Sequence, residues 1–117
     1  MGDQLMTLEN FINIFDELEL VNKGEELDRE VTKPYCCDLL SIAMSKMPQG
    51  AAWVTVMANV NTLAVASLTD AACIILAEGC NFDEASLEKA KEKGITILRS
   101  HMPVFECALM IYKKLNG

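Results

Sequence analysis

Polar side chains that could bind a ligand or transfer a proton follow four apolar segments of this 117-residue sequence. In open α/β sheets a ligand binds beyond the carboxyl ends of the strands, so residues that follow parallel strands share one rim. Helices that begin at this rim also present free backbone N–H groups to an anion. The pattern predicts a small anionic ligand at the rim, with these candidate residues: Asp38, Ser41, Asn59, Asn61, Thr62, Glu78, Ser100 and His101.

Each of these residues also has a purely structural interpretation. Asp38, Asn61 and Ser100 are of types favoured at helix N-caps, and each precedes an expected helix. His101, the single histidine, could act as a general base or contact a phosphate, but an exposed histidine beside a cap is the commoner case. Glu78 is typical of a loop. Residue types and spacing alone leave both interpretations open.

No catalytic constellation accompanies these residues. The sequence contains no phosphate-binding loop, dinucleotide-binding motif, nucleophile elbow or zinc-protease motif. It also lacks a nucleophile with an identifiable base. We therefore expect no catalytic residue, no metal site and no cofactor. A small hydrolase or transferase that uses His101 at the rim is the remaining catalytic alternative.

The five cysteines offer a second kind of chemistry. Their number is odd and no C-x-x-C pair occurs, so neither a disulfide framework nor a thiol redox motif is indicated. Cys73 and Cys107 lie in apolar stretches, where cysteine acts as a small hydrophobic residue. Cys36 and Cys37 form a vicinal pair, which keeps a redox or metal-binding role open, although a second pair of ligands is missing.

The elements that must position these residues centre on residues 53–79, which are predicted to form strand, helix and strand. Residues 53–57 and 72–76 are continuous apolar runs, as expected for parallel strands buried on both faces. The helix expected between them, at 62–70, is apolar on nearly all sides, which predicts that it packs within the domain or against a second copy.

The other elements follow from periodicity and from turn residues. Pro34 removes one ladder donor, so the segment 31–37 is expected to be irregular or at a sheet edge. Asn81 and Glu84 match a capping box before the most charged helix. The last helix is expected to face the core with Phe105, Ala108, Leu109, Tyr112 and Leu115. The remaining expected elements are helices at 8–18, 39–47, 81–93 and after Ser100, and strands at 18–21 and 95–98.

Right-handed crossovers then place helices on both faces of one sheet. The predicted fold is a three-layer α/β/α domain with a mainly parallel sheet of about five strands, covering residues 1–117 as a single domain.

Composition limits the partners. Hydrophobic residues make up 51% of the sequence, which is high for a small domain and favours a homodimer that covers apolar surface. The net charge of −7 disfavours nucleic acid and an anionic membrane surface. No apolar run reaches the roughly 20 residues of a membrane span, and the N-terminus resembles neither a signal peptide nor a myristoylation site. A cytoplasmic protein is expected.

Several segments in this order resemble the DRTGG domain family, over about residues 18–112. They are Asp28-Arg29-Glu30-Val31, Tyr35, Asp38-Leu39-Leu40-Ser41, Asn61, Ala64-Val65-Ala66, Ile74-Ile75-Leu76, Gly79, Phe105-Glu106, Ala108 and Ile111-Tyr112. This bacterial family is similar to the N-terminal domain of HPr kinase/phosphorylase. It also occurs in some phosphotransacetylases and between the CBS domains of some pyrophosphatases. Short free-standing versions are known beside iron-hydrogenase genes.

The resemblance implies an α/β domain that dimerises and has a regulatory or interaction role without catalysis. The kinase activity of the HPr enzyme belongs to a separate P-loop domain, which this chain lacks. Asp28 and Arg29 match the family motif, but Lys33 and Pro34 stand where the family has Gly-Gly. Glycine permits a positive φ or close backbone approach, which proline does not, so a family function that needs either is altered here.

Two functional hypotheses follow. The first is a non-catalytic regulatory or accessory domain, homodimeric, that binds a partner protein or a small anionic, nucleotide-like or phosphorylated ligand. The second is a redox or metal accessory factor for an iron-sulfur enzyme such as an iron hydrogenase, using Cys36 and Cys37.

Overall fold

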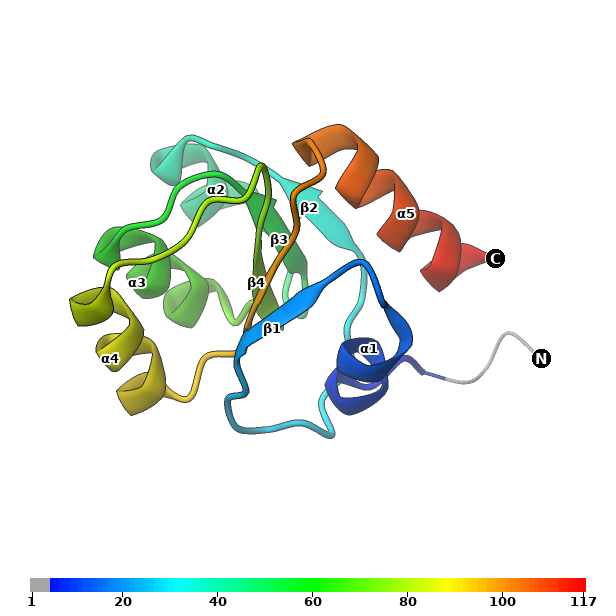
Figure 1. Cartoon of the computed structure of the whole chain (residues 1–117), viewed down its shortest axis with the longest axis horizontal. Coiled ribbons are helices and arrows are strands. Elements are labelled where there is room, and N and C mark those ends of the chain that lie inside the picture. Colours follow the sequence, from blue (N-terminus) through cyan, green and yellow to red (C-terminus); the bar gives the residue numbers. More distant parts are fainter. Residues whose placement is uncertain (1–4) are drawn as a thin grey trace.

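The computed structural model describes residues 5–117, and this part of the chain contains five helices and five strands, which alternate except that β1 and β2 follow each other (Figure 1). The helices are α1 (Leu8–Ile14), α2 (Leu40–Lys46), α3 (Val60–Thr69), α4 (Glu84–Lys93) and α5 (Val104–Asn116). The strands are β1 (Glu19–Asn22), β2 (Pro34–Cys36), β3 (Ala52–Thr55), β4 (Cys73–Leu76) and β5 (Ile97–Arg99).

The strands form one sheet in the order β1-β5-β4-β3-β2. β2, β3, β4 and β5 are parallel, and β1 pairs antiparallel with β5 at one edge. β2 is the other edge strand and begins at Pro34, so the proline lies where its missing N–H costs least. The predicted α/β fold with a mainly parallel five-stranded sheet is confirmed.

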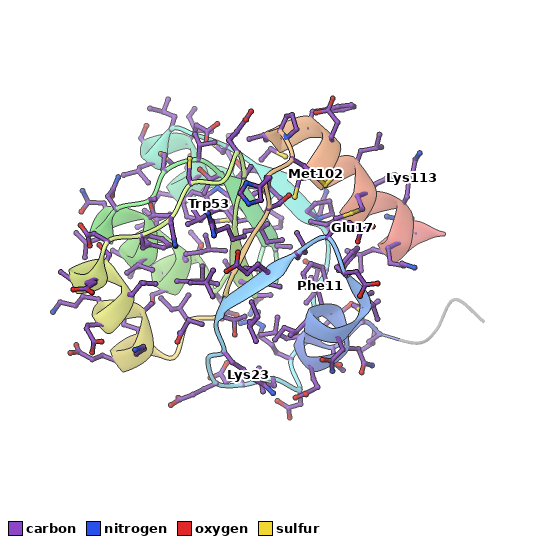
Figure 2. All side chains as sticks on the ribbon, viewed as in Figure 1. Phe11, Glu17, Lys23, Trp53, Met102 and Lys113 are labelled. Carbon is purple, nitrogen blue, oxygen red and sulfur yellow. The ribbon has the colours of Figure 1, made fainter. Side chains whose placement is uncertain are left out.

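Helices cover both faces of the sheet, and adjacent strand residues point to opposite faces. One core cluster joins Val54, Ile75 and Leu98 to α1 and α5. The other joins Trp53, Ile74 and Leu76 to α2, α3 and α4. Figure 2 shows Trp53 and Phe11 inside the molecule, within the two clusters. The three-layer arrangement is therefore as predicted.

One helix ends earlier than expected, and two helices are capped by other residues than expected. α1 ends at Ile14 rather than near residue 18, because Phe15 turns extended with φ −106° and ψ 105°. Asn59, not Asn61, caps α3 and accepts hydrogen bonds from two backbone N–H groups. Asp83, not Asn81, caps α4, because its carboxylate reaches the N–H of Ser86 at 2.8 Å.

The predicted inner stripe of α5 is wrong in its largest members. Phe105 is 68% exposed and Tyr112 is 53% exposed, while the fully buried side chains are Cys107 and Ile111. The inner face follows a different helical row, which contains Cys107 and Ile111. α5 therefore carries apolar residues on both its inner and its outer sides.

α3 buries Thr62, Leu63, Val65 and Ala66 but leaves Leu68 71% exposed. The helix that was expected to be apolar on nearly all sides therefore has one side open to solvent.

None of the helices in residues 5–117 has the length and hydropathy needed to span a bilayer.

Candidate functional site

The carboxyl ends of four parallel strands form the rim that the sequence predicts. Cys36, Val54, Ile75 and Leu98 stand in one row across the sheet, so the loops that follow β2, β3, β4 and β5 emerge at the same level. All eight predicted rim residues lie in these loops or in the first turns of the helices that follow. What they do there differs from residue to residue.

Asp38 does not cap α2, whose N-cap position is Leu39 and which has no side-chain cap. Its carboxylate instead accepts hydrogen bonds from the hydroxyl of Thr55 at 2.6 Å and the N–H of Val56 at 3.0 Å. Asp38 thus ties the loop after β2 to the end of β3. Ser41 lies in the first turn of α2, exposed.

Most polar groups of the turn between β3 and α3 form hydrogen bonds within the turn itself. The Asn59 side chain accepts from the N–H groups of Asn61 and Thr62 at 2.9 and 3.3 Å. The Thr62 hydroxyl is buried and donates to the carbonyl of Met57 at 3.0 Å. Asn61 is exposed, so its amide is the polar side chain of this turn that faces solvent.

The loops after β4 and β5 are joined to each other. The N–H of Glu78 donates to the carbonyl of Met102 at 2.9 Å, and the N–H of Gly79 donates to that of Ser100 at 2.8 Å. His101 lies over Gly79, where a Cβ would meet the imidazole Nδ1 at 2.8 Å. Gly79 has φ +71°, so both its conformation and its surroundings suit glycine.

Ser100 is buried and does not cap α5, because its hydroxyl accepts from the N–H of Met102 at 2.9 Å and the N-cap position is Pro103. The rim therefore brings Glu78, Ser100 and His101 together through the backbone. Asp38, in the loop after β2, is bound separately, to Thr55 at the end of β3 and to Val56.

One rim residue was missed by sequence reasoning. Arg99 ends β5, and its guanidinium donates to the carbonyl of Gly79 at 3.3 Å and to the carboxylate of Glu19 at 2.9 Å. The ion pair with Glu19 joins β5 to the antiparallel strand β1. A cation at the last position of a strand was the signal in the sequence that could have found it.

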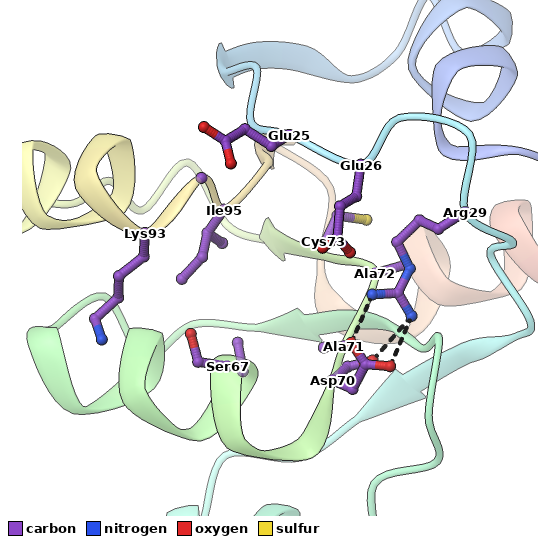
Figure 3. Close-up of a pocket in the computed structure, with 12 residues that line it drawn as sticks. Glu25, Glu26, Arg29, Ser67, Asp70, Ala71, Ala72, Cys73, Lys93 and Ile95 are labelled. Carbon is purple, nitrogen blue, oxygen red and sulfur yellow. Dashed lines mark hydrogen bonds and ion pairs between the residues drawn. The ribbon is translucent and has the colours of Figure 1, made fainter.

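The family-motif residues lie at the opposite end of the sheet from the rim. Arg29 donates to Asp70, with 2.8 Å from Nη1 to Oδ1 and 3.1 Å from Nη2 to the backbone carbonyl (Figure 3). Asp70 follows α3 with φ +59° and also accepts from the amide of Gln49 at 2.7 Å. The hydrogen bonds from Arg29, then the one from Gln49, hold the pKa of Asp70 below its ordinary value.

A cavity of about 180 Å³ lies beside this pair, between the 25–29 loop and the C-terminal ends of α3 and α4. Glu25, Glu26 and Lys93 contribute to its walls with Arg29 and Asp70 (Figure 3). The Nε of Arg29 is buried and has no hydrogen-bond partner among the described side chains. Asp28 is exposed. Arg29, which the resemblance singled out, therefore holds its loop through an ion pair with Asp70 and is not part of the rim.

Of the vicinal cysteines, Cys36 is exposed and Cys37 is half-buried. Partial burial of the thiol, then Asp38, then Cys37 raise the pKa of Cys36, whereas reactive cysteines have lowered pKa values. The Cys37 thiol donates to the carbonyl of Leu39 at 3.3 Å. Burial raises the pKa of Cys73 to about 12 and that of Cys107 to about 11, which keeps both protonated.

Within residues 5–117 no three His, Cys, Asp or Glu side chains are grouped closely enough to hold a metal ion. No observation on the described residues favours the iron-sulfur accessory hypothesis. It stays a prediction, and a Cys36→Ser/Cys37→Ser variant tests it.

No protein-family model matches the sequence, and no curated protein is similar to it. The structure is similar to a crystal structure of the CBS and DRTGG domains of the regulatory region of a Clostridium perfringens pyrophosphatase, solved with its activator, diadenosine tetraphosphate. The TM-score is 0.66 at 16% sequence identity, and the match covers 84% of this chain and 42% of that chain. At this identity the likeness shows the fold alone: this chain has the fold of part of a pyrophosphatase regulatory region.

Proposed function

We propose that this chain is a DRTGG-like regulatory domain without catalytic activity, which binds a small nucleotide-like or phosphorylated anion, or a partner protein, as a homodimer in the cytoplasm. The observation that carries the proposal is the structural likeness to a pyrophosphatase regulatory region, along 84% of this chain. That region was crystallised with a dinucleotide activator, which supports a nucleotide-like ligand here.

The rim is where we place the ligand. α3 begins there with an exposed asparagine in its first turn, and α5 begins there without a side-chain cap. The first N–H groups of an uncapped helix are free to bind an anion. His101 lies beside the start of α5, over Gly79, and can add a hydrogen bond or, when protonated, a positive charge.

Ligand binding is tested by calorimetry and by thermal unfolding with diadenosine tetraphosphate, ATP, AMP, pyrophosphate and inorganic phosphate as probes. A ligand that binds only the folded state raises the melting temperature in proportion to the logarithm of its concentration. We expect at least one nucleotide probe to bind. If none of the probes binds or raises the melting temperature, the anion proposal is wrong and a partner protein is left as the ligand.

The location is tested by a matched pair of variants. Asn61→Asp adds a negative charge in the first turn of α3, at the rim, and Asn10→Asp adds the same charge in the first turn of α1. Asn10 lines a cavity with the C-terminal end of α5, at the other end of the molecule from the rim. A carboxylate in a first turn suits the helix dipole, so both variants keep the fold.

We expect Asn61→Asp to weaken binding of the anion about tenfold or more, since two like charges about 4 Å apart repel by about 1 kcal/mol in bulk water and by more near a protein surface. Asn10→Asp is expected to leave the affinity unchanged. Equal affinities for the two variants and the wild type would place the ligand away from the rim.

A further inference from the structure

The outer side of α5 carries an apolar stripe that the domain leaves largely open, with Leu109 half-buried between two exposed aromatic side chains. Phe105, Leu109 and Tyr112 are spaced by four and three residues, so they lie on one side of the helix. Phe105 is 68% exposed and Tyr112 is 53% exposed, whereas Cys107 and Ile111 on the inner side are fully buried. We call these three residues the α5 stripe.

The α5 stripe lies beside the sheet edge that carries fewer charges. α5 packs beside the edge strand β2 (Figure 1). From residue 31 to residue 39, a range that contains β2, the chain carries only two charged side chains, Lys33 and Asp38. The opposite sheet edge, β1, is flanked between residues 16 and 26 by five carboxylates and one lysine. In a chain of net charge −7, two copies repel each other least where the β2 edge and α5 meet solvent.

Two oppositely charged residues near the two ends of α5 would face each other if a second α5 packed antiparallel against the first. Glu106 and Lys113 are both exposed and flank the same side of the α5 stripe, near opposite ends of the helix. Figure 2 shows Lys113 pointing away from the domain. The two residues are seven positions apart, which is about 10.5 Å along the axis. They therefore lie too far apart to pair within one chain, and neither takes part in an ion pair of the described residues.

We propose that α5 packs antiparallel against α5 of a second copy, about a twofold axis close to Leu109. Antiparallel packing brings Phe105 of one copy towards Tyr112 of the other and sets Glu106 level with Lys113 of the other copy, twice. Parallel packing would instead set each Glu106 level with the other Glu106, on opposite flanks of the contact, and would pair neither residue with an opposite charge. This inference rests on the homodimer of the proposed function and adds its surface and orientation.

Helix packing, rather than strand pairing, joins the two copies. β2 has three residues, and its first is Pro34, which has no N–H to donate to a ladder. The contact is a single pair of helices and is small, so we expect a dissociation constant on the order of 10 µM, typical of weak interfaces.

The surface is tested by sedimentation velocity from ~1 to ~300 µM, which spans that dissociation constant. Tyr112→Glu is expected to be monomeric over this range, with the circular dichroism and the melting temperature of the wild type. Leu68→Glu is the matched control, because Leu68 is 71% exposed on α3, away from α5. It is expected to dimerise like the wild type.

The orientation is tested by exchanging the charges. Glu106→Lys and Lys113→Glu each set like charges together and are expected to weaken dimerisation about tenfold. The double variant exchanges both charges and is expected to dimerise as the wild type does. Each substitution also opposes the α5 dipole, so recovery in the double variant cannot come from a more stable helix.

The possible outcomes distinguish the α5 surface and its orientation from the homodimer itself. A wild type that is monomeric at every concentration overturns both the homodimer and the inference. A wild-type dimer that survives Tyr112→Glu retains the homodimer and overturns the α5 surface. A dimer lost in that variant, with no recovery in the charge-exchanged double variant, overturns the antiparallel orientation. Ligand binding at the rim is measured separately and is independent of all three results.

Discussion

Replacing Asp70 by asparagine tests the ion pair that holds the loop carrying the family motif. Arg29 reaches Asp70 through three hydrogen bonds, two to the carboxylate and one to the backbone carbonyl, and its side chain is only 18% exposed. Asparagine keeps the shape of the side chain and tolerates the left-handed backbone at this position, where φ is +59°. The substitution therefore removes the charge with little other change.

The expected loss follows from the burial of the two partners. A charge-assisted hydrogen bond contributes about 1.5–3 kcal/mol, about twice a neutral one. Asp70 is 49% exposed, so solvent screens the pair and places the loss at the low end of that range. We expect Asp70→Asn to lower the free energy of unfolding by about 1–2 kcal/mol, or the melting temperature by about 3–10 °C.

The pH dependence gives a second, independent readout. The folded-state pKa of Asp70 is lowered, mainly by the hydrogen bonds from Arg29. Its contribution to stability is therefore present above the unfolded-state pKa of about 3.9 and is lost as the pH falls through the folded-state pKa. The stability difference between the wild type and Asp70→Asn should be constant from about pH 5 to pH 7 and shrink below about pH 4.

Urea unfolding at several pH values measures both effects, with Asp28→Asn as the control. Asp28 is exposed, lies next to Arg29 in the sequence, and makes no hydrogen bond among the described side chains. An Asp70→Asn variant within about 0.5 kcal/mol of the wild type, the usual effect of a surface substitution, would refute the reasoning. So would a stability difference that does not change in acid.

Two further predictions concern rim residues. Asp38→Ala leaves the buried hydroxyl of Thr55 without its acceptor at 2.6 Å, so it should lower the free energy of unfolding by about 1–3 kcal/mol. The control Ser41→Ala should change the free energy of unfolding little. Urea unfolding measures both, and equal stabilities of the two variants would show that water replaces the carboxylate. Gly79→Ala forces a side chain to φ +71° and to 2.8 Å from the imidazole of His101, at a cost of about 1–2 kcal/mol. Adding His101→Ala should recover only the part of that cost due to contact, and full recovery would show that the backbone is not strained.

Secondary structure was predictable wherever hydrophobic runs and turn residues act locally. The strand, helix and strand of 53–79 appear as β3, α3 and β4, because continuous apolar runs bury on both faces of a parallel sheet. Pro34 correctly marked an edge. The helix after Gly79 ends at Gly94, as expected, because that glycine adopts φ +68°.

Helix caps were less predictable, because several residues of suitable type compete within a few positions. Asn59 and Asn61 are both good caps, and only the position of the chain leaving β3 selects the first. Asp38 also suits a cap, yet its carboxylate bonds to the end of the neighbouring strand, a partner that the chain order does not reveal. Ser100 was expected at a cap and is buried instead.

For the rim, the sequence correctly indicated a shared position, since parallel strands end at one edge of the sheet. It did not reveal Arg99, which is bound to Glu19 across 80 residues of chain. Nor could it place Arg29, whose acceptor at residue 70 lies at the other end of the sheet from the rim.

The sequence by itself determined the alternation of elements, the layers and the acidic, apolar character of the chain, because these depend on local periodicity and on composition. Only the tertiary structure decided which polar groups are used internally and which face solvent. It also decided that α5 turns Cys107 and Ile111 inward and Phe105 outward. Periodicity finds the apolar rows of a helix, but packing against a neighbour selects the row that is buried.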